Sequence, residues 1–518
     1  MVSKKRISLR SALVAVLAVS ACLFSAGSRL AALDDPPADS PLAVSAIPML
    51  TAGDVQSIIQ AAAASSDAPM VIAVTDRQGD VLGVFRKPGA AATATANFGV
   101  QADTNEVAVA LARTAGFFSN SQAPLSSRTV RFISGIHFPP GIPFTGNAAL
   151  YGIENTNRGC PFNTTYLPGQ DVPPARSIDG TQTGLGILTG KADLNDSKPS
   201  AVNPGGVPLF KGGILVGGVG VAGVDGPVAE FGAFSASFNA GFLPLPPPDP
   251  GVVIIDGIAL PFVNQTTRPA GYGPGTTDGD YVVGPIDAPK PAPEGDLVAP
   301  QDGPVGGLTA AEVRKIVDAT IAEGNLTRAV IRLPLGTRAK FVIAVADLDG
   351  TLIALNRMPD ATIFSIDVAV AKARNVIFFS GPNRLTSDLP GVPINTAITN
   401  RTISFGAQPF YPPGVDYSTP GPFFTLYKFD TLNPCTQGSQ PANANQNGIV
   451  FFPGALPLYR NGVLVGGLGV SGDGVEQDDF ATAAGAVGFE APTKIRADQV
   501  FDQAVRLPYI KFPRNPTD

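Results

Sequence analysis

The sequence is poor in charged side chains and almost free of histidine. Lys, Arg, Asp and Glu make up 15% of its 518 residues, against roughly 25% in an ordinary soluble domain. The formal net charge is −6, whereas a nucleic-acid partner would call for a basic surface. His137 is the only histidine, so mechanisms that need a histidine pair or a histidine-rich metal site are excluded.

Glycine and proline are abundant, by contrast. The chain has 58 Gly and 50 Pro, about a fifth of its residues, which is below the roughly 25–30% that is typical of low-complexity sequence. With 44% hydrophobic residues, the chain has enough apolar surface for a core. We therefore expect a folded protein with many loops, and its length predicts more than one domain.

Residues 1–22 have the pattern of a bacterial export signal. A basic start precedes the apolar run 11–21, which is too short for a stable membrane span. Val19-Ser20-Ala21-Cys22 resembles a lipobox, so we expect cleavage before Cys22 and lipidation of that cysteine, with ordinary signal-peptidase cleavage as the alternative. Either route places the chain outside the cytoplasm, in the periplasm or at the cell surface, and a lipid anchor would be its membrane contact. Residues 23–45 are predicted to be a tether.

The remaining sequence repeats itself. Residues 71–90 align with 342–361 at 9 identities in 20 positions, and 206–223 align with 455–472 at 10 in 18. Shorter matching blocks occur around these segments in the same order. Such self-similarity indicates duplicated structure.

The repeat divides the chain into two copies of one domain. We place domain 1 at 46–264 and domain 2 at 308–518. The segment 265–307 between them is rich in Pro and Gly and is predicted to be a linker.

The elements of each copy can be predicted from local patterns. Thr309 and Glu312 have the spacing of a capping box, which predicts a helix start. Two β-branched runs around a glycine turn at 342–358 predict a hairpin, and a second hairpin is indicated by the Asn461-Gly462 turn. The predicted fold class is α+β: two tandem domains, each an antiparallel β-sheet flanked by helices, packed as an intrachain pseudo-dimer.

Two motifs imitate other functions. Asp347 and Asp349 resemble the nucleophile motif of a phosphohydrolase, but the aligned repeat keeps only Asp76 and the turn glycine, which favours a hairpin turn. The glycine clusters at 217–220 and 466–469 resemble a nucleotide-binding loop. They lie inside predicted strands, where glycine more often allows a close approach of backbone or ligand.

The second copy resembles a known family. Its segments 308–313, 342–358, 365–374 and 455–472 occur in an order that resembles the GlcG/HbpS-like haem-binding family. The resemblance implies small α+β domains that form dimers or larger oligomers. It also implies extracellular or periplasmic binding of haem or a related tetrapyrrole, with roles in haem handling, iron release or redox sensing.

The first copy departs from this pattern. Leu111 stands where the second copy has Lys372. Both copies also carry long insertions, at 143–205 and 416–454, which short family members lack. The fold is therefore a safer inference than the site.

Candidate ligand-binding residues combine this resemblance with side-chain chemistry. An arginine fork can bind a propionate, and histidine is a well-known axial haem ligand. For each residue the alternative is structural: a packed histidine, a salt bridge or a helix cap. Because Phe410 replaces histidine in the second copy, at most one haem per chain could use His137, which is also the metal-ligand candidate. The candidates are His137, Arg128, Arg401, Arg357, Lys372 and Arg374, with Tyr411 and Tyr459 as further oxygen ligands or edge contacts.

The cysteines fit an oxidising compartment. With Cys22 removed or lipidated, Cys160 and Cys435 remain at near-equivalent places in the two copies. If the copies pack as a pseudo-dimer, equivalent residues near its axis face each other. We predict a Cys160–Cys435 disulfide between the domains, with two free buried thiols as the alternative.

These observations favour an exported, non-enzymatic protein that binds haem or another tetrapyrrole. Its partners would be this small molecule and, in a homo-oligomer, further copies of the chain. The alternative is a structural or interaction module of the cell envelope with a vestigial ligand pocket. An enzyme is the third reading.

Overall fold

The computed structural model describes residues 47–162, 175–189, 204–244, 252–255, 258–287 and 291–517. The predicted export signal, Cys22 and the predicted tether lie outside these ranges. Within them, no helix is both long enough and apolar enough to cross a membrane. We call the described residues up to 287 the first half of the chain and those from 291 the second half.

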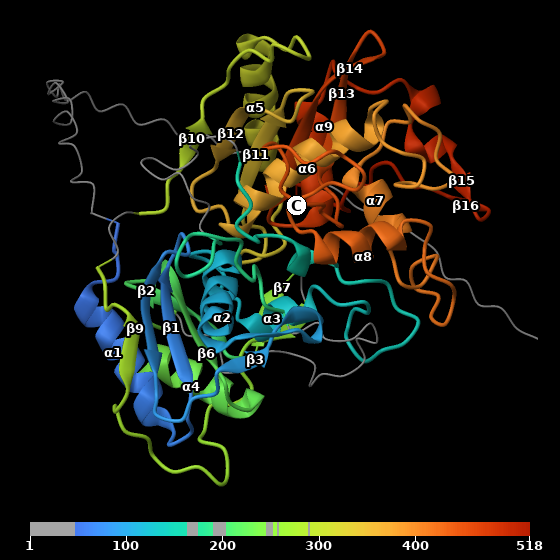
Figure 1. Cartoon of the computed structure of the whole chain (residues 1–518). Helices are drawn as coiled ribbons and strands as arrows, with labels where there is room; N and C mark the ends of the chain where they lie inside the picture. Colours follow the sequence, from blue (N-terminus) through green and yellow to red (C-terminus); the bar gives the residue numbers. More distant parts are fainter. Residues whose placement is uncertain are drawn as a thin grey trace, which may run out of the picture. The chain divides into compact units, whose positions relative to one another are not determined.

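Each half contains a five-stranded antiparallel sheet, and the two sheets have the same strand order (Figure 1). The first runs β5-β6-β1-β2-β9 and the second β13-β14-β11-β12-β10. Ala73 pairs with Gly220 and Ala344 with Gly469, so the register repeats as well. The strands are β5 (Gly206–Lys211), β6 (Ile214–Ala222), β1 (Val71–Asp76), β2 (Val81–Arg86) and β9 (Asp280–Val283), then β13 (Ala455–Arg460), β14 (Val463–Gly472), β11 (Phe341–Ala346), β12 (Leu352–Arg357) and β10 (Gly295–Val298).

Helices cover both faces of each sheet. Ile72 and Val74 of β1 share a core with α1, whereas Val71 and Ala73 pack with α2 on the other face, as the alternation of a strand requires. In the second half α6 takes the place of α2, and α5 with α9 that of α1 with α4. The helices are α1 (Ala52–Ser65), α2 (Thr104–Phe118), α3 (Ser127–Phe132), α4 (Gly226–Asn239), α5 (Ala310–Gly324), α6 (Phe364–Ser380), α7 (Asn400–Gly406), α8 (Phe424–Leu432) and α9 (Val475–Gly485).

Smaller elements complete the described chain. The hairpin β3–β4 lies between β2 and α2, and β7–β8 and β15–β16 are short two-stranded pairs. Their bounds, with those of the 3-10 helices, are β3 (Thr93–Thr95), β4 (Gln101–Asp103), β7 (Val252–Ile255), β8 (Ile258–Pro261), β15 (Phe501–Asp502), β16 (Val505–Arg506), η1 (Asn97–Gly99), η2 (Ile153–Asn155), η3 (Thr493–Ile495) and η4 (Ala497–Gln499).

The predicted elements are confirmed. Thr309 and Glu312 form a capping box at the start of α5. Asp347 precedes a turn between the antiparallel strands β11 and β12, so this segment lacks the parallel strand and following helix that a phosphohydrolase needs. The α+β class with antiparallel sheets is therefore correct.

The glycines inside β6 and β14 allow a helix to pack directly on the strand. A Cβ atom added to Gly220 would lie 2.0 Å from the carbonyl oxygen of Ala108 on α2. A Cβ on Gly469 would lie 2.2 Å from the carbonyl oxygen of Ala369 on α6. Only glycine fits such distances. The glycines thus allow the backbone of a strand and the backbone of a helix to approach each other within one domain. The glycine clusters are not nucleotide-binding loops.

The predicted linker contains a strand of each sheet. Strand β9 pairs with β2 at the edge of the first sheet, and β10 pairs with β12 at the edge of the second. Both strands fall within 265–307. This segment therefore takes part in both sheets and does more than connect the copies.

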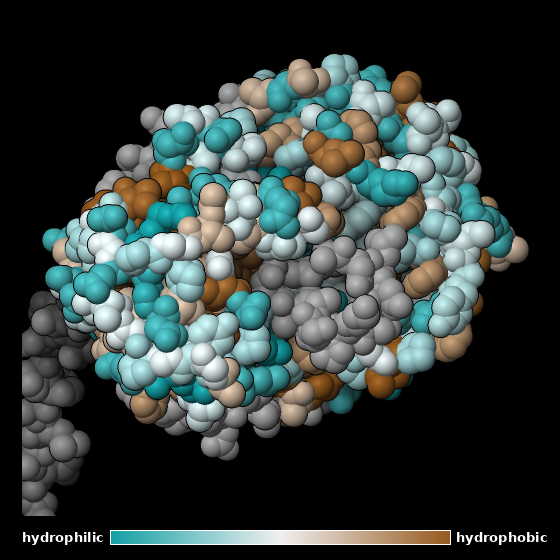
Figure 2. All heavy atoms as spheres, turned by 60° about the horizontal axis from the view of Figure 1, so that its bottom comes forward, coloured by the Kyte–Doolittle hydropathy of each residue, from teal (hydrophilic) through white to brown (hydrophobic). Residues whose placement is uncertain are grey.

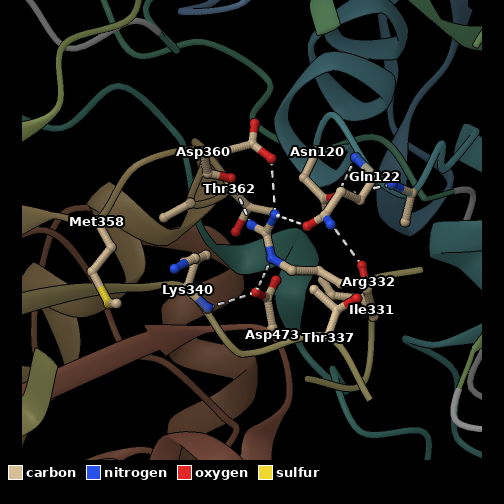
Figure 3. A network of polar contacts seen from close by, with 12 residues as sticks. Asn120, Gln122, Ile331, Arg332, Thr337, Lys340, Met358, Asp360, Thr362 and Asp473 are labelled. Carbon is tan, nitrogen blue, oxygen red and sulfur yellow. Dashed lines mark hydrogen bonds and ion pairs between the residues drawn. The ribbon is translucent and has the colours of Figure 1, made fainter. Parts of the chain in front are cut away.

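The two halves meet through a polar network (Figure 3). Arg332 Nη1 donates to Gln122 Oε1 of the first half at 3.2 Å and to Asp360 Oδ2 at 2.8 Å, and its Nε binds Asp473. Asn120 Nδ2 donates to the carbonyl oxygen of Ile331 at 2.9 Å. Contacts of this kind support the predicted pseudo-dimer.

The disulfide predicted between the copies is present. Cys160 and Cys435 are bonded, with their Cα atoms 5.5 Å apart and 275 residues between them in sequence. The alternative of two free thiols is therefore not what the structure has.

On the face shown in Figure 2, hydrophilic and hydrophobic residues are intermingled, and the most hydrophobic ones form small separate groups. A mixed surface of this kind gives no broad apolar face on this side of the molecule.

Candidate functional site

Two of the predicted residues lie at equivalent places in the halves. Arg128 binds Glu230 through both arms of its fork, with Nε–Oε1 at 2.6 Å and Nη2–Oε2 at 2.9 Å. Arg401 binds Asp479 at the equivalent place, through Nε. The guanidinium groups are thus neutralised within their own domains, as the salt-bridge alternative anticipated.

In the second half, Lys372 lies next to the ion pair Arg401–Asp479 and is fully buried. Its Nζ donates to the carbonyl oxygen of Val470 at 2.8 Å and to Asp478 Oδ2 at 2.9 Å. The ammonium also lies 4.9 Å from the centre of the Phe452 ring. Burial lowers the pKa of Lys372 and raises that of Asp478 to about 7, because a buried site disfavours both charged forms.

The first half has no charges at the corresponding positions. Leu111 replaces Lys372, and Ala229 replaces Asp478 in the ungapped alignment of β6–α4 with β14–α9. A cavity of about 560 Å³ lies here, which we call the first-half cavity. Its walls include Ala94, Gln101, Val107, Leu111, Arg128 and Ala229.

A larger cavity of about 1080 Å³, the second-half cavity, lies at the C-terminal end of α6. One wall comes from α6, a second from the hairpin β13–β14 and a third from the loop 437–445. Amide side chains of Asn and Gln are frequent in that loop. The lining includes Arg374, Ile377, Phe378, Tyr459, Val463 and Leu464.

Two predicted residues, Arg374 and Tyr459, line the second-half cavity. Arg374 is buried, and its Nε, Nη1 and Nη2 donate to the carbonyl oxygen of Gly350 at 2.9 Å, Asn447 Oδ1 at 3.0 Å and the carbonyl oxygen of Phe162 at 2.8 Å. Burial lowers its pKa to about 10. Arg374 thus fixes the turn before β12 and reaches across to the first half.

Arg357 lines neither cavity. It is fully buried and donates to the carbonyl oxygens of Ala361 and Pro293, each at 2.9 Å. Burial lowers its pKa to about 9. Its contacts hold the end of β12 against the segment before β10.

His137 lies in a contact between the halves and lines neither cavity. Its Nε2 is 2.9 Å from Asp416 Oδ1, and both side chains are buried. Burial acts to raise the pKa of Asp416, but hydrogen bonds from His137 and the Phe144 amide outweigh it and lower the pKa. Among the described residues, no group of three or more His, Cys, Asp or Glu side chains is arranged to hold a metal ion.

Sequence reasoning missed the cavity walls. The second-half cavity depends on amides at Gln437, Gln440, Asn443 and Asn445, which lie in the predicted insertion 416–454. The run of Asn and Gln in this insertion was the available signal. The first-half cavity depends on the hairpin β3–β4, which has no counterpart between β12 and α6.

Comparisons with known proteins point to one family. Residues 308–487 match the family described as "Haem degrading protein HbpS-like". The corrinoid adenosyltransferases PduO of Salmonella typhimurium and Citrobacter freundii are each 29% identical over 161 residues, 31% of this chain. The match spans 35% and 36% of their lengths, so this chain is similar to about a third of these relatives.

Two solved structures are similar to part of the chain. The PduOC:haem complex is 20% identical, with a TM-score of 0.24, and the match covers 36% of this chain and 97% of that one. The Klebsiella pneumoniae protein ORFY is 19% identical, with a TM-score of 0.23, and the match covers 35% and 90%. The match to the HbpS-like family thus covers the region from 308 to 487, in the second half of the chain.

Proposed function

We propose that the chain binds haem or another tetrapyrrole in the second-half cavity. The observation that carries the proposal is that this cavity of about 1080 Å³ is built mainly by the region that matches the HbpS-like family. The description of that family names haem, and the curated relatives are named for a corrinoid, which is also a macrocycle of this class. Small-molecule sites usually measure about 300–1,000 Å³, so the cavity is large enough.

The walls of the cavity suit the parts of a tetrapyrrole. Ile377, Phe378 and Leu464 offer apolar contact to a macrocycle. Asn383 and Gln440 could donate hydrogen bonds to propionates, and Arg374 would add positive charge. When bound, haem would supply the redox chemistry of its iron.

Tyr459 is the residue in this lining that suits an iron ligand, since tyrosine serves as an axial ligand in some haem proteins. It is buried, and burial raises the pKa of its hydroxyl to about 12. The equivalent residue in the first half is Phe210. The fold therefore accepts phenylalanine at this strand position, which makes Tyr459→Phe a conservative test.

The proposal includes export and lipidation. It is supported by the pattern of residues 1–22 and by the Cys160–Cys435 disulfide, because such bonds persist in oxidising compartments. We propose binding without turnover, in haem or iron handling or in redox sensing. Incorporation of labelled palmitate by the wild type but not by Cys22→Ala would test the anchor.

The cavity is tested by blocking its entrance. Val463 lines the second-half cavity and is 66% exposed, so Val463→Trp should fill space without disturbing the core. We expect it to weaken haemin binding about tenfold or more, which corresponds to roughly 1.4 kcal/mol. The measurement is a Soret titration of the mature chain with haemin, protoporphyrin IX and hydroxocobalamin.

A matched control is available in the first half. Ile214 occupies the same place in the hairpin β5–β6 and does not belong to the lining of the two cavities described above. Ile214→Trp should bind haemin like the wild type. Tyr459→Phe should change the haemin spectrum and leave protoporphyrin IX binding intact. No Soret change at micromolar haemin, or equal affinities in Val463→Trp and Ile214→Trp, would overturn the proposal.

A further inference from the structure

Two structural differences between the halves shape the first-half cavity. The first is the loss of the buried ion pair Lys372–Asp478, whose counterparts are Leu111 and Ala229. The second is the hairpin β3–β4, which has no counterpart before α6. Leu111 and Ala229 form one side of the cavity and the hairpin forms another, so both differences shape the same space.

The charges around this cavity disfavour an anionic ligand. Arg128 is the basic residue among the described lining, and Glu230 already binds it through both oxygens. Asp225 lies at the rim, is exposed, and makes no capping hydrogen bond to α4. A carboxylate or sulfonate here would meet an arginine that already binds a carboxylate, together with the acidic side chain of Asp225.

The remaining lining is apolar or neutral. Val107, Leu111 and Val221 provide hydrocarbon surface. On the hairpin, Gln101 Nε2 donates to Thr95 Oγ1 at 2.8 Å, which leaves the amide oxygen of Gln101 available as an acceptor. The volume of about 560 Å³ is in the usual range for a small-molecule site.

From this arrangement we infer that the first half holds a second binding site, separate from the proposed tetrapyrrole site and selective for an uncharged, mainly apolar small molecule. Haem, with two propionates, is the wrong class for it. The duplication has thus produced two cavities of different chemistry in one chain. This inference does not depend on the proposed function of the second half.

The experiment compares two fluorescent probes that share an arylamine–naphthalene skeleton. N-phenyl-1-naphthylamine is neutral, and 8-anilinonaphthalene-1-sulfonate is an anion. We expect the mature chain to bind the neutral probe saturably and at least about tenfold more tightly than the anion, a difference of roughly 1.4 kcal/mol. Comparable affinity for the two probes would overturn the inferred selectivity.

Variants locate the neutral probe. Ala94→Trp fills the cavity from the hairpin, where Ala94 is partly exposed, and should abolish its saturable binding while haemin binding is unchanged. Val463→Trp, which lies at the other cavity, should leave the saturable binding of the neutral probe intact. The double variant Leu111→Lys with Ala229→Asp rebuilds the ion pair of the second half and should also abolish probe binding. Retention of probe binding in Ala94→Trp and in the double variant, or its loss in Val463→Trp, would refute the site.

Discussion

At the scale of single residues, burial decides what the charged side chains do. The sequence marks arginines that could hold propionates. In the structure, Arg357 and Arg374 donate mainly to backbone carbonyls, and Arg128 and Arg401 bind carboxylates. A single sequence cannot separate these outcomes, because an arginine that fixes a turn and one that binds a ligand have the same side chain. Only the surrounding acceptors distinguish them.

Asp367 gives a residue-scale prediction about pH. It is buried, accepts hydrogen bonds from the Asn157 amide at 2.8 Å and from Asn447 Nδ2, and its burial raises its pKa to about 6. A raised pKa means that the folded chain holds this proton after the unfolded chain has released it. Its contribution to stability is therefore greatest below about pH 4 and is lost as the pH rises through about 6.

We expect Asp367→Asn to remove part of this pH dependence. Between pH 4 and 6.5 the free energy of unfolding of Asp367→Asn should fall less than that of the wild type. The difference between the two decreases should be on the order of 3 kcal/mol, which corresponds to a pKa raised by about two. Urea denaturation at several pH values measures the slope. The same substitution at the exposed Asp278 serves as the control for the loss of a carboxyl group. Identical slopes in all three proteins would contradict the assignment.

At the scale of elements, the repeat made most of the fold predictable. Capping boxes, the Asn461-Gly462 turn and the strand glycines each have a counterpart in the other copy. Each local pattern therefore predicts the same element twice. The edge strands β9 and β10 were missed, because each has only four residues in a Pro/Gly-rich segment without apolar alternation. Their positions depend on the free edges of β2 and β12, which no local pattern shows.

Helix α2 can lie on β6 only while glycine occupies the contact. Gly220→Ala would place a methyl carbon 2.0 Å from the carbonyl oxygen of Ala108, so we expect a loss of about 3 kcal/mol or more in the free energy of unfolding. Gly146→Ala is the matched change, because nothing lies within 4 Å of its Cβ position and no positive φ is required. Equal denaturation midpoints for the two variants would show that α2 moves away at little cost.

At the scale of the whole molecule, the disulfide ties the two halves. Cross-linking residues 275 apart restricts the unfolded chain strongly, and such a bond can contribute up to about 5 kcal/mol. The double variant Cys160→Ser, Cys435→Ser should therefore unfold at a markedly lower temperature. Thermal unfolding of this variant beside the wild type with and without reductant measures the effect. If the reductant lowers the unfolding midpoint of the variant as much as that of the wild type, the loss of the disulfide does not explain the effect of the reductant.

The segment between the copies also governs how the protein can be divided. Because β9 and β10 close the edges of the two sheets, a fragment cut at the family boundaries 308 and 487 would lack β10, and β12 would become an open edge. Unpaired backbone groups along such an edge promote pairing with other chains. A shortened domain is thus prone to self-association, and the sequence between the repeats protects each sheet from aggregation.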